Sequence, residues 1–101
     1  MLDSHQRRHL KRLAHGLKPV VFIGQSGVSP TVVRAFQEAL QRHELIKLKF
    51  NEFKEKENKS EIVAALVERT GAEAVGMVGH TAIFFLAHPD PDKRRIKLPS
   101  K

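Results

Sequence analysis

The chain has 101 residues, a net charge of +7 and 41% hydrophobic residues, which fits one basic domain with one modest core. It contains no cysteine, so disulfides, thiolate metal ligands and cysteine nucleophiles are excluded. No apolar run approaches the roughly 20 residues of a membrane helix, and Asp3, Arg7 and Arg8 stand where a secretory signal would be apolar, so we expect a soluble, cytoplasmic protein with no membrane partner.

The first predicted element is an amphipathic helix, with Ser4 as its N-cap and Gly16 as its stop. Its apolar stripe has i, i+3, i+4 and i+7 spacing and consists of Leu10, Leu13, Ala14 and Leu17. The opposite face and its flanks carry six basic or imidazole side chains, which are Arg7, Arg8, Lys11, Arg12, His15 and Lys18. Because like charges repel one another, a helix face of a single sign indicates an anionic partner.

A buried strand is predicted at 20–23, because this run after Pro19 is short, wholly apolar and mostly β-branched. A glycine-containing loop follows, and a second helix then begins with Ser29 as its N-cap and Pro30 at its first helical position. The expected buried face of that helix consists of Val32, Val33, Phe36 and Leu40.

The loop between this strand and helix has the sequence Gly24-Gln25-Ser26-Gly27. Amides at a helix start, together with the helix dipole, form an anion site, and glycines allow a ligand to approach the backbone closely. We therefore expect a phosphate on the amides of residues 26–29. The alternative interpretation is a tight turn in which the glycines serve geometry alone. The loop lacks the lysine of a nucleotide P-loop and the third glycine of a dinucleotide fingerprint, so we expect no cofactor.

A half-buried strand is predicted at 45–50, where apolar residues alternate with Lys47 and Lys49. The residues expected to face the core are Ile46, Leu48 and Phe50. A polar stretch over 51–59 should run as a loop into a third helix that ends at Gly71. The buried stripe of that helix is expected to consist of Ile62, Val63, Leu66 and Val67.

Two final apolar runs, 74–78 and 81–86, flank Gly79-His80 and predict a hairpin. The tail 89–101, which is rich in proline and basic residues, is expected to be extended and partly disordered. The resulting order is α-β-α-β-α-β-β. It predicts a single compact α/β domain with a mixed four-stranded sheet and helices packed on it.

Positive charge is concentrated at the two ends of the chain. Residues 1–18 hold five Lys or Arg against one acid and residues 74–101 five against two, whereas residues 19–73 hold eight against eight. Segregated charge of this kind is typical of a polyanion-binding protein. Lys47 and Lys49 add a possible further basic patch. Since the chain has no Trp or Tyr, we expect nucleic-acid recognition mainly through backbone and shape.

Catalytic and metal-binding patterns are weak. His5 and His9 have the i, i+4 spacing of metal ligands, but no acid completes an H-E-x-x-H motif, so no metal site is expected. Ser26 and Ser29 lie outside any G-x-S-x-G elbow, and the acids over 52–61 alternate with lysines as on a solvated surface. We expect a protein that is not an enzyme and has no small-molecule substrate. Two alternatives stay open: an adaptor whose basic face binds an acidic protein, and a small phosphoesterase.

Six short segments of the chain form a specific set of motifs, at 13–15, 17–21, 23–28, 43–47, 70–72 and 95–99, which read Leu-Ala-His, Leu-Lys-Pro-Val-Val, Ile-Gly-Gln-Ser-Gly-Val, His-Glu-Leu-Ile-Lys, Thr-Gly-Ala and Arg-Ile-Lys-Leu-Pro. In this order they resemble the YhbY family, whose fold is the CRM (chloroplast RNA splicing and ribosome maturation) domain. The resemblance implies a stand-alone bacterial CRM domain over 1–98, with residues 99–101 as a disordered end. It also implies a fold similar to the C-terminal domain of a bacterial translation initiation factor.

The resemblance further implies an RNA-binding protein that associates with precursors of the large ribosomal subunit. The RNA surface of the family carries over onto Gly24, Gln25, Ser26 and Gly27, together with the basic positions of the first helix. Gln25 and Ser26 are uncharged where many relatives place a basic residue. This difference shifts the expected RNA contact toward the loop amides and the first helix.

Overall fold

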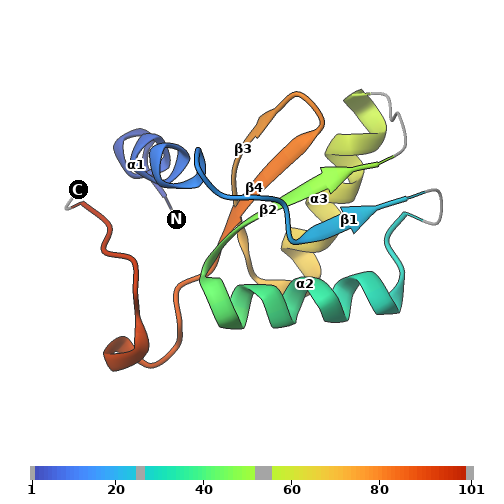
Figure 1. Cartoon of the computed structure of the whole chain (residues 1–101). Coiled ribbons are helices and arrows are strands. Elements are labelled where there is room, and N and C mark those ends of the chain that lie inside the picture. Colours follow the sequence, from blue (N-terminus) through green and yellow to red (C-terminus); the bar gives the residue numbers. More distant parts are fainter. Residues whose placement is uncertain (1, 25–26, 52–55, 100–101) are drawn as a thin grey trace.

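The structure, a computed structural model, describes residues 2–24, 27–51 and 56–99 (Figure 1). Its elements are α1 Ser4–Ala14, β1 Val21–Ile23, α2 Pro30–His43, β2 Leu45–Phe50, α3 Lys56–Thr70, β3 Glu73–Val78, β4 Thr81–Phe85 and the 3-10 helix η1 Pro91–Lys93. The predicted α-β-α-β-α-β-β order is confirmed, and η1 adds one short turn in the tail.

The four strands form one mixed sheet in the order β1-β2-β4-β3. β1 is parallel to β2, and the remaining two pairs are antiparallel. α2 and α3 cover one face of the sheet, and α1 lies across the other face (Figure 1). The helices therefore form the two outer layers around a single central sheet.

Two hydrophobic clusters fill the spaces between these layers. The larger lies between the sheet and the helices α2 and α3, and it centres on Phe36 and Phe84, whose rings meet edge to face at 4.8 Å. The smaller lies under α1 and consists of Leu2, Leu10, Ala14, Leu45, Val75, Ile83 and Phe85. The predicted inward residues of β2 and of α3 belong to the larger cluster, so both predicted stripes are confirmed.

The caps of the helices follow the sequence with one exception. Ser29 caps α2, with its Oγ accepting a hydrogen bond from the Val32 N–H at 3.2 Å. The N-cap of α1, however, is Asp3, so the prediction of Ser4 was wrong. The Asp3 carboxylate accepts from the Gln6 N–H, and the Gln6 side chain accepts in return from the Asp3 N–H. Only Asp3 has a partner of this kind three residues later, because Arg7 would occupy that position for Ser4.

The predicted apolar stripe of α1 was only partly right. Leu10 and Ala14 are fully buried, but Leu13 and Leu17 are 45% and 41% exposed. The helix ends at Ala14, two residues before Gly16, so Leu17 does not extend its stripe. The prediction of a wholly buried first strand was also wrong, because Val20 and Phe22 are 46% and 49% exposed. β1 is an edge strand, and its residues alternate between the α2–α3 layer and the opposite face.

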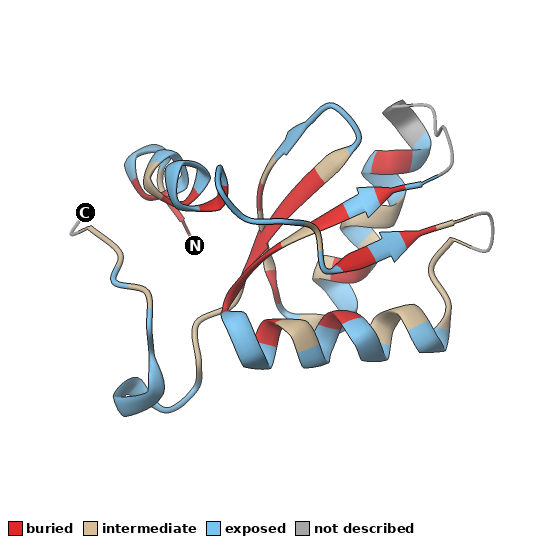
Figure 2. Ribbon diagram, in the orientation of Figure 1, coloured by how far each residue is buried: buried red, intermediate tan, exposed pale blue. Residues whose placement is uncertain are grey.

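Parts of the C-terminal tail contact the rest of the domain, and Figure 2 shows stretches of intermediate burial among its exposed residues. Ile96 and Leu98 contact the smaller cluster, and the Pro99 carbonyl accepts a hydrogen bond from the Gln6 side chain at 3.1 Å. The Glu44 carboxylate accepts from three backbone N–H groups of the tail region. Pro99 is thus part of the fold, while residues 100 and 101 lie outside the described residues.

Candidate nucleic-acid interface

The predicted basic side chains lie on α1 and its C-terminal extension, and one of them, Lys11, reaches over β3. All six predicted side chains are exposed, namely Arg7, Arg8, Lys11, Arg12, His15 and Lys18. The helix itself contains no acidic residue, so this surface, which we call the α1 basic face, is cationic along its whole length. Lys11 and Arg12 occupy its last turn, where positive charge also stabilises the helix through the macrodipole.

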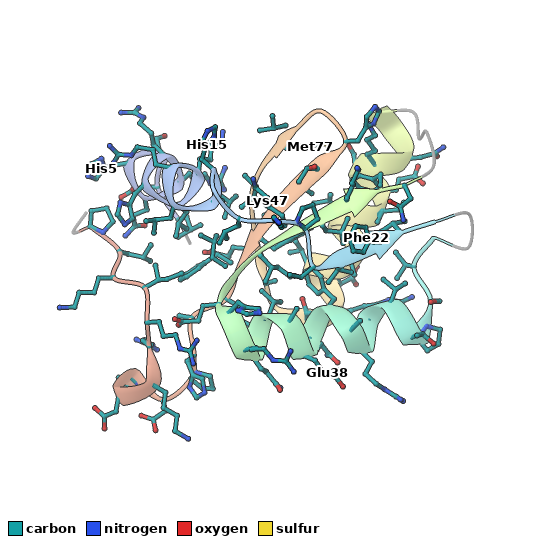
Figure 3. All side chains as sticks on the ribbon, in the orientation of Figure 1. His5, His15, Phe22, Glu38, Lys47 and Met77 are labelled. Atoms are coloured by element: carbon teal, nitrogen blue, oxygen red, sulfur yellow. The ribbon has the colours of Figure 1, made fainter. Side chains whose placement is uncertain are left out.

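Lys47 and Lys49 project from β2 on the same side of the sheet as α1, but they differ in environment. The Lys47 Nζ donates to the His15 carbonyl at 3.3 Å, so this lysine joins β2 to the C-terminal end of α1 (Figure 3). Lys49 is exposed. Lys47 therefore helps to position α1, whereas Lys49 is exposed to solvent.

Gly24 and Gly27, the two glycines of the predicted loop, lie between β1 and α2 and are hydrogen-bonded to each other. The Gly27 N–H donates to the Gly24 carbonyl at 3.1 Å, and Gly27 has a φ of +63°. Only glycine adopts this conformation without strain, which explains the residue type. The Gly27 N–H already donates to Gly24, so a bound phosphate would have to accept hydrogen bonds from other amides near Gly27. Gln25 and Ser26, the middle residues of the predicted site, lie outside the described residues.

The structure separates the two parts of the predicted site. The domain measures 38 × 24 × 23 Å, and α1 and the C-terminal end of β1, which leads to Gly24, lie toward opposite ends of it in Figure 1. Lys47 is brought to α1, whereas Gly24 and Gly27 are not. β1 runs from the α1 side toward the loop, and its exposed Phe22 lies between Lys47 and the loop end (Figure 3).

Phe22 was missed by the sequence interpretation, which placed it in a wholly buried strand. The available signal was its position in the middle of an apolar run, where the period of two puts it on the face opposite its neighbours Val21 and Ile23. What the sequence did not reveal is that this face is open at β1. Half-exposed aromatic rings beside lysines are common elements of nucleic-acid surfaces.

Lys11 lies across β3. A Cβ at Gly76 would collide with the Cε of Lys11 and lie 3.1 Å from its Nζ. The end of the Lys11 side chain, with its ammonium group, therefore lies directly over the glycine backbone. The lack of a side chain at Gly76 thus allows the charged end of Lys11 to lie in this position.

Within the described residues, no three His, Asp or Glu side chains come together as a metal site, and none of the described helices is long and apolar enough to cross a membrane. The features that stand out are a cationic helix, two lysines on the sheet, an exposed ring and a glycine turn. Together they define a small α/β domain with exposed cationic side chains on α1 and β2.

Comparison with known proteins places this domain in a family. The model of the CRS1/YhbY (CRM) domain matches residues 2–85, and the chain therefore belongs to that family. An RNA-binding protein of Haemophilus influenzae is 39% identical over 100 residues, covering 99% of this chain and 97% of that protein. A Bacillus subtilis protein named "Probable RNA-binding protein YqeI" is 31% identical, covering 98% of this chain and 100% of its own length.

A solved structure supports the same assignment. The solution structure of SAV1595 from Staphylococcus aureus matches with a TM-score of 0.78 and 30% sequence identity, covering 98% of this chain and 100% of that one. The predicted YhbY resemblance and CRM fold are therefore confirmed. The curated relatives are named for binding RNA.

Proposed function

We propose that this protein binds RNA without catalysing a reaction on it, and that its target is ribosomal RNA in precursors of the large ribosomal subunit. RNA binding is supported by the names of its relatives and by the segregated charge of the chain. The ribosomal target is supported by the family resemblance. No catalytic group is needed for this function, since retention of an RNA segment is sufficient.

The observation that carries the proposal is the α1 basic face. Its charges are exposed over a helix whose other side, at Leu10 and Ala14, is fully buried. The core beneath α1 therefore fixes the orientation of the helix and keeps its basic side exposed. A polyanion that lies along α1 would relieve their mutual repulsion and release its own counterions.

The Gly24–Gly27 turn supplies the second proposed contact. Its glycines let an RNA backbone approach the start of α2, where the helix dipole favours a phosphate. Lys47 and Lys49 lie on the face between this turn and α1 and would contact intervening phosphates. The protein would then contact the RNA backbone over the length of the domain and would recognise mostly the shape of the RNA.

The salt dependence of RNA affinity tests the electrostatic mechanism. If about four to six phosphates of a single strand are neutralised, log affinity falls against log salt with a slope of roughly −3 to −4. Fluorescence anisotropy with a labelled ribosomal RNA fragment over a salt series measures this slope. A nearly flat dependence contradicts binding through the α1 basic face.

The ribosomal target requires a test in cells. The protein is crosslinked to RNA, and the recovered RNA is sequenced, while gradient sedimentation shows which ribosomal particles carry the protein. Enrichment of large-subunit RNA and migration with immature large subunits are expected. Recovery of an acidic protein with no RNA would instead favour the adaptor function.

A further inference from the structure

Phe22 is an exposed aromatic side chain on the sheet face that α1 covers only in part. Its neighbours Val21 and Ile23 are buried under α2 and α3, whereas Phe22 points to the opposite face and is 49% exposed. A phenylalanine in this position contributes little to either core. Its exposure is therefore a feature that the packing of the domain does not account for.

Phe22 begins a row of residues that crosses the whole sheet. It is the register partner of Lys49, Lys49 pairs with Thr81, and Thr81 pairs with Val78. Adjacent strands lie about 4.8 Å apart, so these four side chains stand next to one another on one face. Lys49 and Val78 are exposed and Thr81 is partly exposed, so the row, which we call the Phe22 row, forms an open strip.

Hydrogen bonds fix both ends of the Phe22 row to the rest of the domain. The hairpin tip is fixed to α3 through the Lys59 Nζ, which lies 3.5 Å from the Gly79 carbonyl and 2.7 Å from the His80 Nδ1. β1 is fixed to β2 by the Val20 and Asn51 amides, which donate to Lys47 and Ile23 at 3.0 and 2.8 Å. A rigid surface of this kind loses little conformational entropy when a flat ligand lies on it.

The charge around the row complements a nucleotide. Lys49 stands beside Phe22 on the next strand, and Lys47 follows two residues away along β2, about 7 Å further toward α1. Lys11 reaches the same face over Gly76. An aromatic ring with ammonium groups beside it suits a nucleotide, because a nucleotide carries an aromatic base and a phosphate close together.

We propose that the Phe22 row is a stacking platform for an unpaired base of bound RNA, with the ring of Phe22 under the base and Lys49 on the adjoining phosphate. This inference rests on the proposed RNA binding and adds a preference for single-stranded over paired RNA. Bases within an A-form duplex are stacked on each other and cannot lie on an external ring. The platform also lies between the loop and α1, so a strand that contacts both ends passes over it.

The first test compares Phe22→Leu with Met77→Leu as a matched control. Met77 is 39% exposed and pairs with Ala82, which places it on the other face of the sheet. We expect Phe22→Leu to weaken binding of a single strand of about twelve nucleotides by roughly 5- to 150-fold. Its affinity for the duplex of the same sequence should change less than about twofold, and Met77→Leu should change neither.

The second test uses the absence of tryptophan from the chain. Phe22→Trp introduces a single reporter whose fluorescence should be quenched when a base of the single strand stacks on it. Met77→Trp should show no such change, and circular dichroism confirms the fold of each variant. If the unmutated protein binds single-stranded RNA but Phe22→Leu binds equally well and Phe22→Trp shows no quenching, the platform is disproved while RNA binding stands. If the unmutated protein binds no RNA, the proposed function fails and the platform with it.

Discussion

The Glu44 carboxylate accepts a hydrogen bond from the Arg95 backbone N–H at 2.6 Å, joining the end of α2 to a residue 51 positions later. The same carboxylate also accepts from the amides of Ile96 and His88 at 3.2 and 2.8 Å. Glu44 is buried and has a φ of +64°, which is unfavourable for any residue but glycine and costs about 1–3 kcal/mol. Three hydrogen bonds to a charged acceptor offset this strain and hold the tail on the domain.

Replacing Glu44 with glutamine should release part of the tail. An amide keeps the size of the side chain but retains one acceptor oxygen, so some of the tail amides lose their partner. We expect a loss of about 1–3 kcal/mol in the free energy of unfolding, measured by urea denaturation, and faster hydrogen exchange at His88, Arg95 and Ile96. Glu38→Gln on the exposed side of α2 is the control and should change stability by less than about 0.5 kcal/mol (Figure 3). Equal effects of the two variants would contradict the role of the Glu44 carboxylate in holding the tail.

The same carboxylate should make the domain sensitive to acid. Burial alone raises the pKa of Glu44, but the N–H donors of His88, Arg95 and Ile96, with the charge of His88, outweigh it and hold this pKa below its ordinary value. A lowered pKa in the folded state stabilises the protein above the ordinary pKa, and the stabilisation is lost as pH falls through the lowered value. Stability of the unmutated protein should therefore decline below about pH 5. Glu44→Gln should decline less over the same range, as measured by urea unfolding at a series of pH values.

Local rules predict where the elements of this domain lie. Ser29 and Pro30 mark the start of α2 because capping is decided within about four residues. Gly71, at a φ of +78°, ends α3, and Gly79, at +60°, opens the hairpin turn, because both need a conformation that glycine supplies. The alternation of apolar and charged residues along β2 is also a local signal, because a strand that buries one face carries apolar residues at every second position.

The surroundings of those elements could not be predicted in the same way. Phe22 is exposed because β1 is an edge strand and α1 stops short of it, and neither fact is present in a four-residue apolar run. Glu44 binds a tail about 50 residues away, so its role depends on long-range packing. The α1 basic face was evident from charge alone, but its separation from Gly24 and Gly27 depends on how the chain crosses the sheet.

Removing charge from the α1 basic face should weaken RNA binding and spare the fold. Arg8 and Arg12 are exposed one turn apart, so Arg8→Gln with Arg12→Gln leaves the buried side of the helix intact. We expect the salt slope to fall by about 1.4 and affinity near 0.1 M salt to fall about tenfold or more. The control is Arg34→Gln with Arg69→Gln, which removes the same charge from exposed positions on α2 and α3. Equal losses in both double variants would show that net charge, and not α1, governs binding.

Gly76→Ala should displace Lys11 at little cost in stability. The new methyl group would occupy the place of the Lys11 Cε, and the end of a lysine can move aside easily. We expect a change in the free energy of unfolding within about 0.5 kcal/mol and a few-fold loss of RNA affinity. If the loss acts through Lys11, Gly76→Ala in a Lys11→Gln background should add nothing further. Full additivity in this double-mutant cycle would show that Gly76 affects binding by another route.

The turn at Gly27 gives a direct test of whether a phosphate sits at the start of α2. Gly27→Asp and Gly27→Asn add side chains of nearly equal size at a φ of +63°, which Asp and Asn tolerate better than most residues. A Cβ at this position meets nothing within 4 Å, so neither variant should clash with the fold. Both should therefore lose a similar amount of stability, about 1–3 kcal/mol at most, as measured by thermal melts. The aspartate alone places a negative charge where the phosphate is expected, so its RNA affinity should fall well below that of the asparagine variant. The same difference should appear in sedimentation with large-subunit precursors. If the two variants bind RNA equally well, no phosphate sits beside Gly27, and the glycines of this loop serve the turn alone.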